Sequence, residues 1–158
     1  SGISSAPSAA TLNISGHSAG NDADVVVLKS TAMSGDGSTA LAASEFFSSI
    51  DYSTAYSGEV TTWNLSANNA ITLNSTALTD IGNNDNFTVA VVEYDSDAQN
   101  TATSDSVSAG VDYSTTIYID YTAAASGYGH KVSGVASGSI AKVNTVATAS
   151  IGKVNTVD

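Results

Sequence analysis

The feature that most constrains the fold is a series of short runs of β-branched and aromatic residues, each bounded by Gly, Asn, Asp or Ser. Such runs are typical of β-strands that end in turns. Six strands are predicted, at Thr11–Ser15, Val25–Lys29, Glu59–Leu65, Ala70–Asn74, Phe87–Tyr94 and Thr115–Thr122. The strand runs do not alternate with long helical patterns, which argues against a doubly wound α/β sheet. We therefore expect an all-β chain, an antiparallel β-sandwich of jelly-roll type.

The predicted strands differ in how deeply we expect them to be buried. Phe87–Tyr94 is apolar on both faces in its middle, which is typical of a central strand. Thr115–Thr122 alternates apolar and polar residues and is expected to be half exposed. Short helices are expected at Ser38–Phe47 and at Ser75–Ile81, the second ending at Gly82. The predicted core contains Trp63, Leu65, Ile71, Leu73, Val89, Val91, Ile117 and Ile119.

Composition limits both the size of the fold and the classes of partner. The 158 residues suit one domain, and they carry 15 acidic residues against four lysines, for a net charge of −11. A chain this acidic is repelled by phosphate backbones and anionic lipid surfaces, so neither nucleic acid nor membrane is expected as a partner. Cysteine is absent, which excludes disulfides and thiolate metal sites.

The pattern changes from Gly127 onward, where an eleven-residue repeat begins. Ser139-Ile-Ala-Lys-Val-Asn-Thr-Val146 recurs as Ser150-Ile-Gly-Lys-Val-Asn-Thr-Val157, with a weaker copy at Lys131–Val135. Each unit has room for a strand, a turn at Asn-Thr and a return, but it is too small to bury its own apolar side chains. We divide the chain into a sandwich domain, residues 1–126, and this repeat tail, residues 127–158.

The repeat tail is expected to be an assembly or anchoring element. The residues predicted to carry the contact are Lys131, Lys142, Lys153, Ile140, Val143, Ile151 and Val154. Their charge suits an acidic neighbour, which includes another copy of this chain. The alternative is that the repeats fold back as extra strands on their own sandwich.

One motif resembles a catalytic signature. Gly16-His-Ser18-Ala-Gly20 matches the G-x-S-x-G pattern of a nucleophile elbow, and Asp112 or Asp120 followed by His130 would complete the order Ser, Asp, His. An elbow, however, needs a helix after the serine, and here a polar turn and a valine run follow it. We therefore interpret the motif as a hairpin turn and predict that the chain is not an enzyme.

Two weaker patterns suggest ligands. Acidic turns at Asp22 and Asp24 and at Asp95 and Asp97 could supply oxygen ligands to a structural calcium ion, but the second lacks the glycine and the closing glutamate of a calcium loop. We expect solvated turns and no cofactor. Trp63, the only tryptophan, is expected in the core; the alternative is a sugar-stacking platform with Tyr52, Tyr56 or Tyr94, and hence a surface glycan as partner.

Two stretches carry a resemblance to a known group of proteins. The stretch from Ser57 to Ile81, continued by Phe87–Asp95, resembles β-sandwich modules of marine phage structural proteins. The repeat tail is similar to lysine-valine-asparagine-glycine-valine repeats of phage virion proteins, with threonine here in place of the glycine. The resemblance covers about half of the chain. It implies a virion location, and it implies that another strand precedes Ser8–Ile14, supplied by a missing segment or by another subunit.

These observations lead to one expected function and two alternatives. We expect a non-enzymatic structural protein of a phage virion, a head decoration, fibre or tail fibre component, whose partners are other copies of itself and other virion proteins. The first alternative is a subunit of a bacterial or archaeal extracellular surface filament built by strand exchange. The second is a carbohydrate-binding β-sandwich module at a cell surface.

Overall fold

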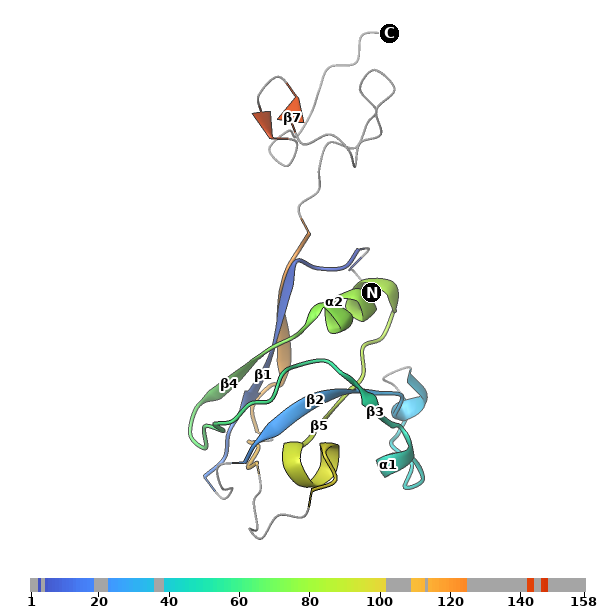
Figure 1. Cartoon of the computed structure of the whole chain (residues 1–158), viewed down its shortest axis with the longest axis vertical. Coiled ribbons are helices and arrows are strands. Elements are labelled where there is room, and N and C mark those ends of the chain that lie inside the picture. The colour runs from blue at the N-terminus through green and yellow to red at the C-terminus, as the bar shows by residue number, and fades with distance from the viewer. Residues whose placement is uncertain are drawn as a thin grey trace. The chain divides into compact units, whose positions relative to one another are not determined.

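The structure, a computed structural model, describes residues 3, 5–18, 23–35, 39–101, 109–112 and 114–124, and the backbone of 142–143 and 146–147. Strands predominate among the described residues, and the helices are short (Figure 1). In chain order the elements are β1 (Ala9–Ser15), β2 (Val25–Ser30), η1 (Met33–Gly35), α1 (Glu45–Ser48), β3 (Ile50–Ala55), β4 (Asn68–Thr72), α2 (Ser75–Asn83), β5 (Val89–Glu93), η2 (Tyr94–Ala98), β6 (Tyr118–Thr122), β7 (Lys142–Val143) and β8 (Val146–Ala147). The chain is therefore mostly β, as predicted.

The strands of residues 1–123 form two three-stranded antiparallel sheets, in the orders β4-β1-β6 and β3-β2-β5. β1 and β2 are the central strands. In the first sheet, Leu12 of β1 lies between Ile71 of β4 and Ile119 of β6. In the second sheet, all of β2 is buried except Lys29, which is half-buried. The two central strands, both nearly free of charge, supply the middle of each sheet.

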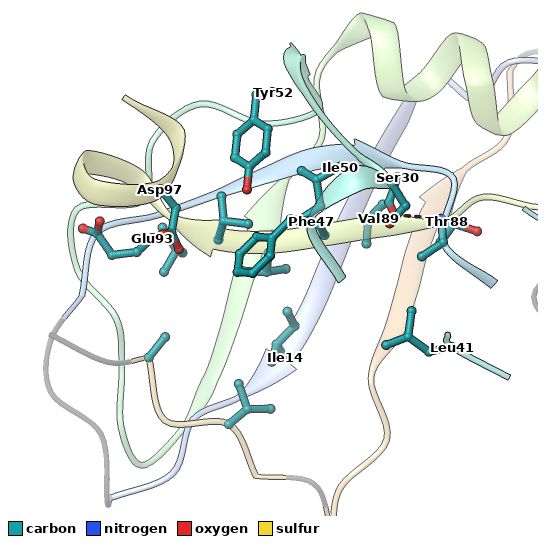
Figure 2. A pocket seen from close by; sticks show the side chains of 18 of the residues that line it. Ile14, Ser30, Leu41, Phe47, Ile50, Tyr52, Thr88, Val89, Glu93 and Asp97 are labelled. Carbon is teal, nitrogen blue, oxygen red and sulfur yellow. Dashed lines mark hydrogen bonds between the residues drawn. The ribbon is translucent and has the colours of Figure 1, made fainter. Parts of the chain in front are cut away.

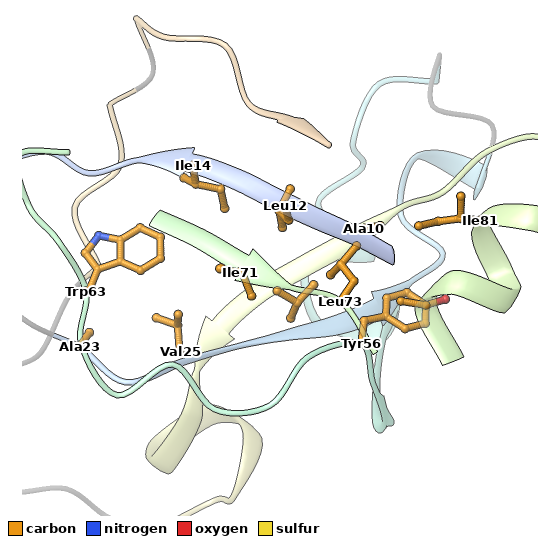
Figure 3. Close-up of a cluster of buried hydrophobic side chains, with 12 residues drawn as sticks. Ala10, Leu12, Ile14, Ala23, Val25, Tyr56, Trp63, Ile71, Leu73 and Ile81 are labelled. Atoms are coloured by element: carbon orange, nitrogen blue, oxygen red, sulfur yellow. The ribbon is translucent and has the colours of Figure 1, made fainter. Parts of the chain in front are cut away.

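Apolar side chains from both sheets meet in one core (Figure 3). Its buried members are Ala10, Leu12, Ile14, Ala23, Val25, Val27, Tyr56, Trp63, Ile71, Leu73, Ala77 and Ile81. Alternation places Leu12 and Ile14 of β1 on the same side as Ile71 of β4, as the two-residue period of a strand requires. Helix α2 closes one end of the core with its two buried residues, Ala77 and Ile81.

The β3–β4 side of residues 1–123 is closed by hydrogen bonds that join the two sheets. Asn74, which follows β4, donates its backbone N–H to the carbonyl of Tyr56 and its side-chain amide to the carbonyl of Ala55, each over 2.8 Å. The same side chain caps α2 by accepting from the N–H groups of Thr76 and Ala77. One residue thus caps a helix and links the sheets.

Strand positions differ from the prediction in two places. Glu59–Leu65 is not a strand: only Val60 pairs, in an isolated bridge to Val25, and the segment instead carries Trp63 into the core. Ile50–Ala55, which was not predicted, is strand β3. Its few apolar residues give no local signal, and its pairing with β2 is irregular, because the register shifts between Leu28 and Lys29.

Two further strand predictions differ from the structure, one in depth and the other in bounds. β5, expected to be central, lies at the edge of its sheet and has no fully buried residue. Thr115–Thr122 forms a strand only over Tyr118–Thr122, and Ile117 before it is exposed. β5 has apolar residues on both faces, yet it does not lie between two strands. No strand among the described residues pairs with its outer side.

The predicted core is confirmed for some residues and wrong for others. Trp63, Ile71 and Leu73 are buried core residues. Leu65, Val89 and Ile119 are partly buried and pack against that core. Val91 and Ile117, in contrast, are 36% and 53% exposed, and the prediction that they belong to the core is wrong. Both line a cavity beside β5.

The predicted helices are present with different bounds. In the segment 38–47 only the short helix α1 forms, starting at Glu45, whose carboxylate accepts the backbone N–H of Ala42 over 2.8 Å. Helix α2 continues through Gly82, which was expected to terminate it, and ends at Asn83. Gly82 is needed for a close approach, because a Cβ there would lie 2.2 Å from the backbone nitrogen of Ala6.

The chain separates into two compact units, residues 1–123 and 124–158. In the second unit the described backbone is one antiparallel pair, with Lys142 opposite Ala147 and Val143 opposite Val146. The two strands are separated in sequence by Asn-Thr, where a turn was expected. None of the helices in the described residues is long and apolar enough to cross a membrane.

Candidate functional site

One surface feature of residues 1–123 is the outer edge of β5, with which no described strand pairs. Hydrogen bonds join Tyr94 to Asp24 and Ser30 to Thr88, so the backbone groups of Thr88, Ala90, Val92 and Tyr94 face β2. In an antiparallel ladder the intervening residues point their backbone groups the other way. Val89, Val91 and Glu93 therefore present N–H and C=O groups at the outer edge of the sheet.

A cavity of about 570 Å³ lies along this edge, and we call it the β5 groove (Figure 2). Its described lining is mainly apolar and comes from β5, from Ile14, Val25 and Trp63 of the core, and from Ala109, Val111 and Ile117. A further set of apolar and aromatic residues borders it, comprising Ala23, Ala32, Met33, Leu41, Phe47, Ile50 and Tyr52. The groove thus exposes the interior between the two sheets on the β5 side.

The groove borders both faces of β5. Val89 and Val91 lie on one face and Ala90 and Val92 on the other, and all four line it. In Figure 2, Ile50 and Tyr52 lie on one side of the β5 ribbon and Ile14 lies on the other. An exposed edge strand with apolar residues on both faces is a template for pairing with another strand.

The charged residues in the described lining of the groove are all acidic: Glu45, Glu93 and Asp97. Glu93 accepts hydrogen bonds from the N–H of Ser96 over 2.5 Å and from its hydroxyl over 2.6 Å. Burial alone would raise the pKa of Glu93, but these hydrogen bonds outweigh it and lower the pKa. The carboxylate is therefore ionised at neutral pH and adds negative charge to the groove.

A cluster of polar side chains around Asp80 lies on the β3–β4 side, and its role is structural. Asp80 of α2 accepts from the ammonium group of Lys29 over 2.8 Å and from the hydroxyl of Tyr56 over 2.5 Å. Both hydrogen bonds lower the pKa of Asp80, that from Lys29 first. Burial and then the bond to Asp80 raise the pKa of Tyr56, whose ring is buried and stacks on Phe87 with centroids 5.0 Å apart. This cluster joins α2 to Lys29 of β2 and to Tyr56, which follows β3.

The described part of the G-x-S-x-G motif is an extension of a strand ladder. Gly16 pairs with Val111, and the N–H of His17 donates to the carbonyl of Gly110 over 2.9 Å. A Cβ at position 16 would lie 1.7 Å from the carbonyl oxygen of Asn64, so the glycine permits a close backbone approach. Ser18 is exposed beyond this ladder.

The two aspartates considered as partners of that serine accept hydrogen bonds from other residues. Asp112 accepts hydrogen bonds from its neighbour Ser114, which lower its pKa, and Asp120 accepts one from Asn13. His130 lies outside the described residues. The absence of enzymatic activity stays a prediction.

The calcium candidates lie near one end of β5. Asp95 and Asp97 belong to the helical turn η2, and the carbonyl of Asp24 accepts the N–H of Tyr94 over 2.8 Å. Asp22 lies outside the described residues. Within the described part of the chain, no three His, Cys, Asp or Glu residues gather in a group that could hold a metal ion.

The predicted assembly residues are largely outside the described part of the chain. Only the backbone of Lys142 and Val143, in β7, is described. The residues of the β5 groove were not predicted as a site. The run 87–94, which is apolar on both faces, is a signal for such a site only when the strand is known to lie at the edge of its sheet. Comparison with protein-family models, curated proteins and solved structures finds no match to this chain.

Proposed function

We propose that this chain is a non-enzymatic structural protein that assembles with other copies of itself by accepting an additional β-strand along β5. The observation that carries the proposal is the apolar β5 groove beside a strand edge with which no described strand pairs. An added strand gains main-chain hydrogen bonds from the edge, and its alternate side chains fill the pockets beside it. Covering apolar surface stabilises such a contact by about 25 cal/mol per Å².

The proposal includes a finer description of the fold as an antiparallel, jelly-roll-like β-sandwich. Side chains of both sheets share one core, which supports two facing layers. On one side, hydrogen bonds around Asn74 join the layers; on the other, the groove separates β5 from Ile117, which precedes β6. A strand added at β5 would cover the interior on that side.

For the biological setting we propose a phage particle, in which the protein is a head decoration, fibre or tail fibre component. The support is the resemblance of two stretches of the chain to phage structural proteins, together with a repeat tail suited to contacts with many copies. A bacterial or archaeal surface filament built by strand exchange would use the same edge contact.

A carbohydrate-binding role is less well supported by the aromatic residues. Trp63 is only 2% exposed and donates its indole N–H to the carbonyl of Gly110 over 2.9 Å. Tyr56 is equally buried. Neither ring can stack on a sugar, and Tyr52 is the candidate that remains exposed.

The test is the effect of a charge on the β5 edge. Val91→Lys places an ammonium group in the groove, and lysine on an edge strand opposes strand addition. Thr72→Lys is the matched control, because Thr72 is also a β-branched, exposed residue of an edge strand, β4. Sedimentation velocity of the full chain over a range of concentrations measures self-association.

We expect the wild-type chain and Thr72→Lys to associate alike, and Val91→Lys to weaken association by about tenfold or more, which corresponds to about 1.4 kcal/mol. Circular dichroism checks that both variants stay folded. A wild-type chain that stays monomeric throughout, or a folded Val91→Lys that associates like wild type, would refute the proposal.

A further inference from the structure

We infer that the strand accepted by β5 is a repeat unit, residues 139–147, from the tail of a second copy of this chain. This inference rests on the proposed function, because it names the occupant of the same edge. Three observations support it: the conformation of the unit, its pattern of side chains, and its charge.

The repeat unit already contains a pair of short strands, and no other described strand pairs with them. β7 and β8 form an antiparallel pair of two residues each. An isolated two-stranded hairpin is marginally stable at best in water, and a third strand or an apolar surface is needed to stabilise it. The unpaired edge of β5 supplies the third strand, and the β5 groove supplies the apolar surface.

The side-chain pattern of the unit suits a groove that accepts one apolar face. In the β7–β8 pair, Val143 lies opposite Val146 and Lys142 lies opposite Ala147. Opposite positions of an antiparallel pair share a face, so Val143 and Val146 define one uncharged face, and Lys142 and Ala147 belong to the other. The pair laid along β5 can therefore turn its uncharged face toward the core side of the groove.

Charge selects the tail from the other segments of the chain. Residues 1–126 contain 14 of the 15 acidic residues and one lysine, Lys29, whose ammonium group is 2.8 Å from Asp80. Residues 127–158 contain three lysines and one acid, Asp158. The β5 groove is lined by Glu45, Glu93 and Asp97, so the tail is the part of the chain with complementary charge.

The number of repeat units favours exchange between copies. The tail carries two close copies of the unit, at 139–146 and 150–157, so a chain that filled its own groove would retain a second unit for a neighbour. Residues 124–138, which precede the first of these repeats, would span at most about 50 Å if fully extended at 3.3 Å per residue.

Single-cysteine cross-linking tests the inference in the full chain, because the sequence contains no cysteine. Val91→Cys in one batch is mixed with Val143→Cys in a second batch that carries a different mass tag, and a short bis-maleimide joins cysteines that lie close together. Each chain holds one cysteine, so every cross-link is between copies. Thr72→Cys mixed with Val143→Cys is the control, and Ile117→Cys is a second reporter in the groove.

We expect the Val91–Val143 and Ile117–Val143 mixtures to yield about tenfold more heterodimer than the Thr72–Val143 control, corresponding to a preference of about 1.4 kcal/mol. Lys142→Glu in the donor chain should lower that yield at low salt. Cross-linking yields no higher than that of the control would overturn the inference. A chain that carries both Val91→Cys and Val143→Cys and forms cross-links only within itself would also overturn it. If Val91→Lys blocks association but these cross-links are absent, the edge accepts another strand: the inference fails and the proposed function stands.

Discussion

Truncation of Leu12 to alanine measures how much of the stability resides in the shared core. Leu12 is 3% exposed, in the central strand of its sheet between Ile71 and Ile119. The change removes three carbon groups, worth about 2.4 kcal/mol in transfer free energy. The cavity left in the core beside Ile71 and Ile119 raises the expected loss to about 3–4 kcal/mol.

Leu41→Ala is the matched control, since the chemical change is identical and Leu41 is 48% exposed. We expect it to cost about 0.5 kcal/mol, as surface substitutions do. The assay is urea unfolding at low protein concentration, followed by the fluorescence of Trp63, the single tryptophan, which is buried when folded. Circular dichroism at the same urea concentrations tests that unfolding is two-state.

With an m-value of about 2 kcal/mol per molar, the urea midpoint of Leu12→Ala should fall by about 1.5–2 M, and that of Leu41→Ala by about 0.3 M. Losses of unfolding free energy within about 1 kcal/mol of each other would refute the assignment of Leu12 to a closely filled core.

Two further predictions concern the closed side and a backbone contact. Because hydrogen bonds from Lys29 and Tyr56 lower the pKa of Asp80, its stabilising effect is present above the ordinary carboxyl pKa of about 4 and is lost as pH falls through the lowered value. Urea titrations from about pH 6 to 2 should therefore show a steeper loss of stability for wild type than for Asp80→Asn, and equal slopes would contradict the shift. Gly16→Ala should cost about 1–3 kcal/mol in the same assay, because the new Cβ meets a carbonyl oxygen at 1.7 Å. Gly58→Ala, with no atom within 4 Å of its Cβ, is the control, and an equal cost would contradict the close approach.

Most strands could be predicted because the signal for them, a β-branched or apolar run that ends at turn residues, lies within the segment itself. The run Val25–Lys29 and the alternation around Leu12 are strongly β-branched or apolar and end at turn residues, and both became strands near the predicted bounds. Ile50–Ala55 has no such signal: it becomes a strand through hydrogen bonds to β2, which lies 20 or more positions earlier in the sequence. Glu59–Leu65 has the composition of a strand, but its path across the core to bury Trp63 leaves only Val60 paired.

The candidate site was predictable only in part. The basic, repetitive tail and its contrast with the acidic remainder are properties of composition, and they suggested an assembly element without any coordinates. The acceptor surface was not predictable in the same way. The run Phe87–Tyr94 has the composition of a central strand, and from the residues alone a central strand and an apolar edge strand are alike.

The order of strands in the sheet distinguishes a central strand from an apolar edge strand. Residues such as Val91 are exposed because β2 pairs with β5 on one side and no described strand follows on the other. Pairing order depends on contacts between residues far apart in the chain, whereas hydrophobic periodicity reports only which residues share a face. Composition and local pattern therefore specified the β class, the turns and the charge asymmetry, and long-range pairing alone decided which apolar strand became an open edge.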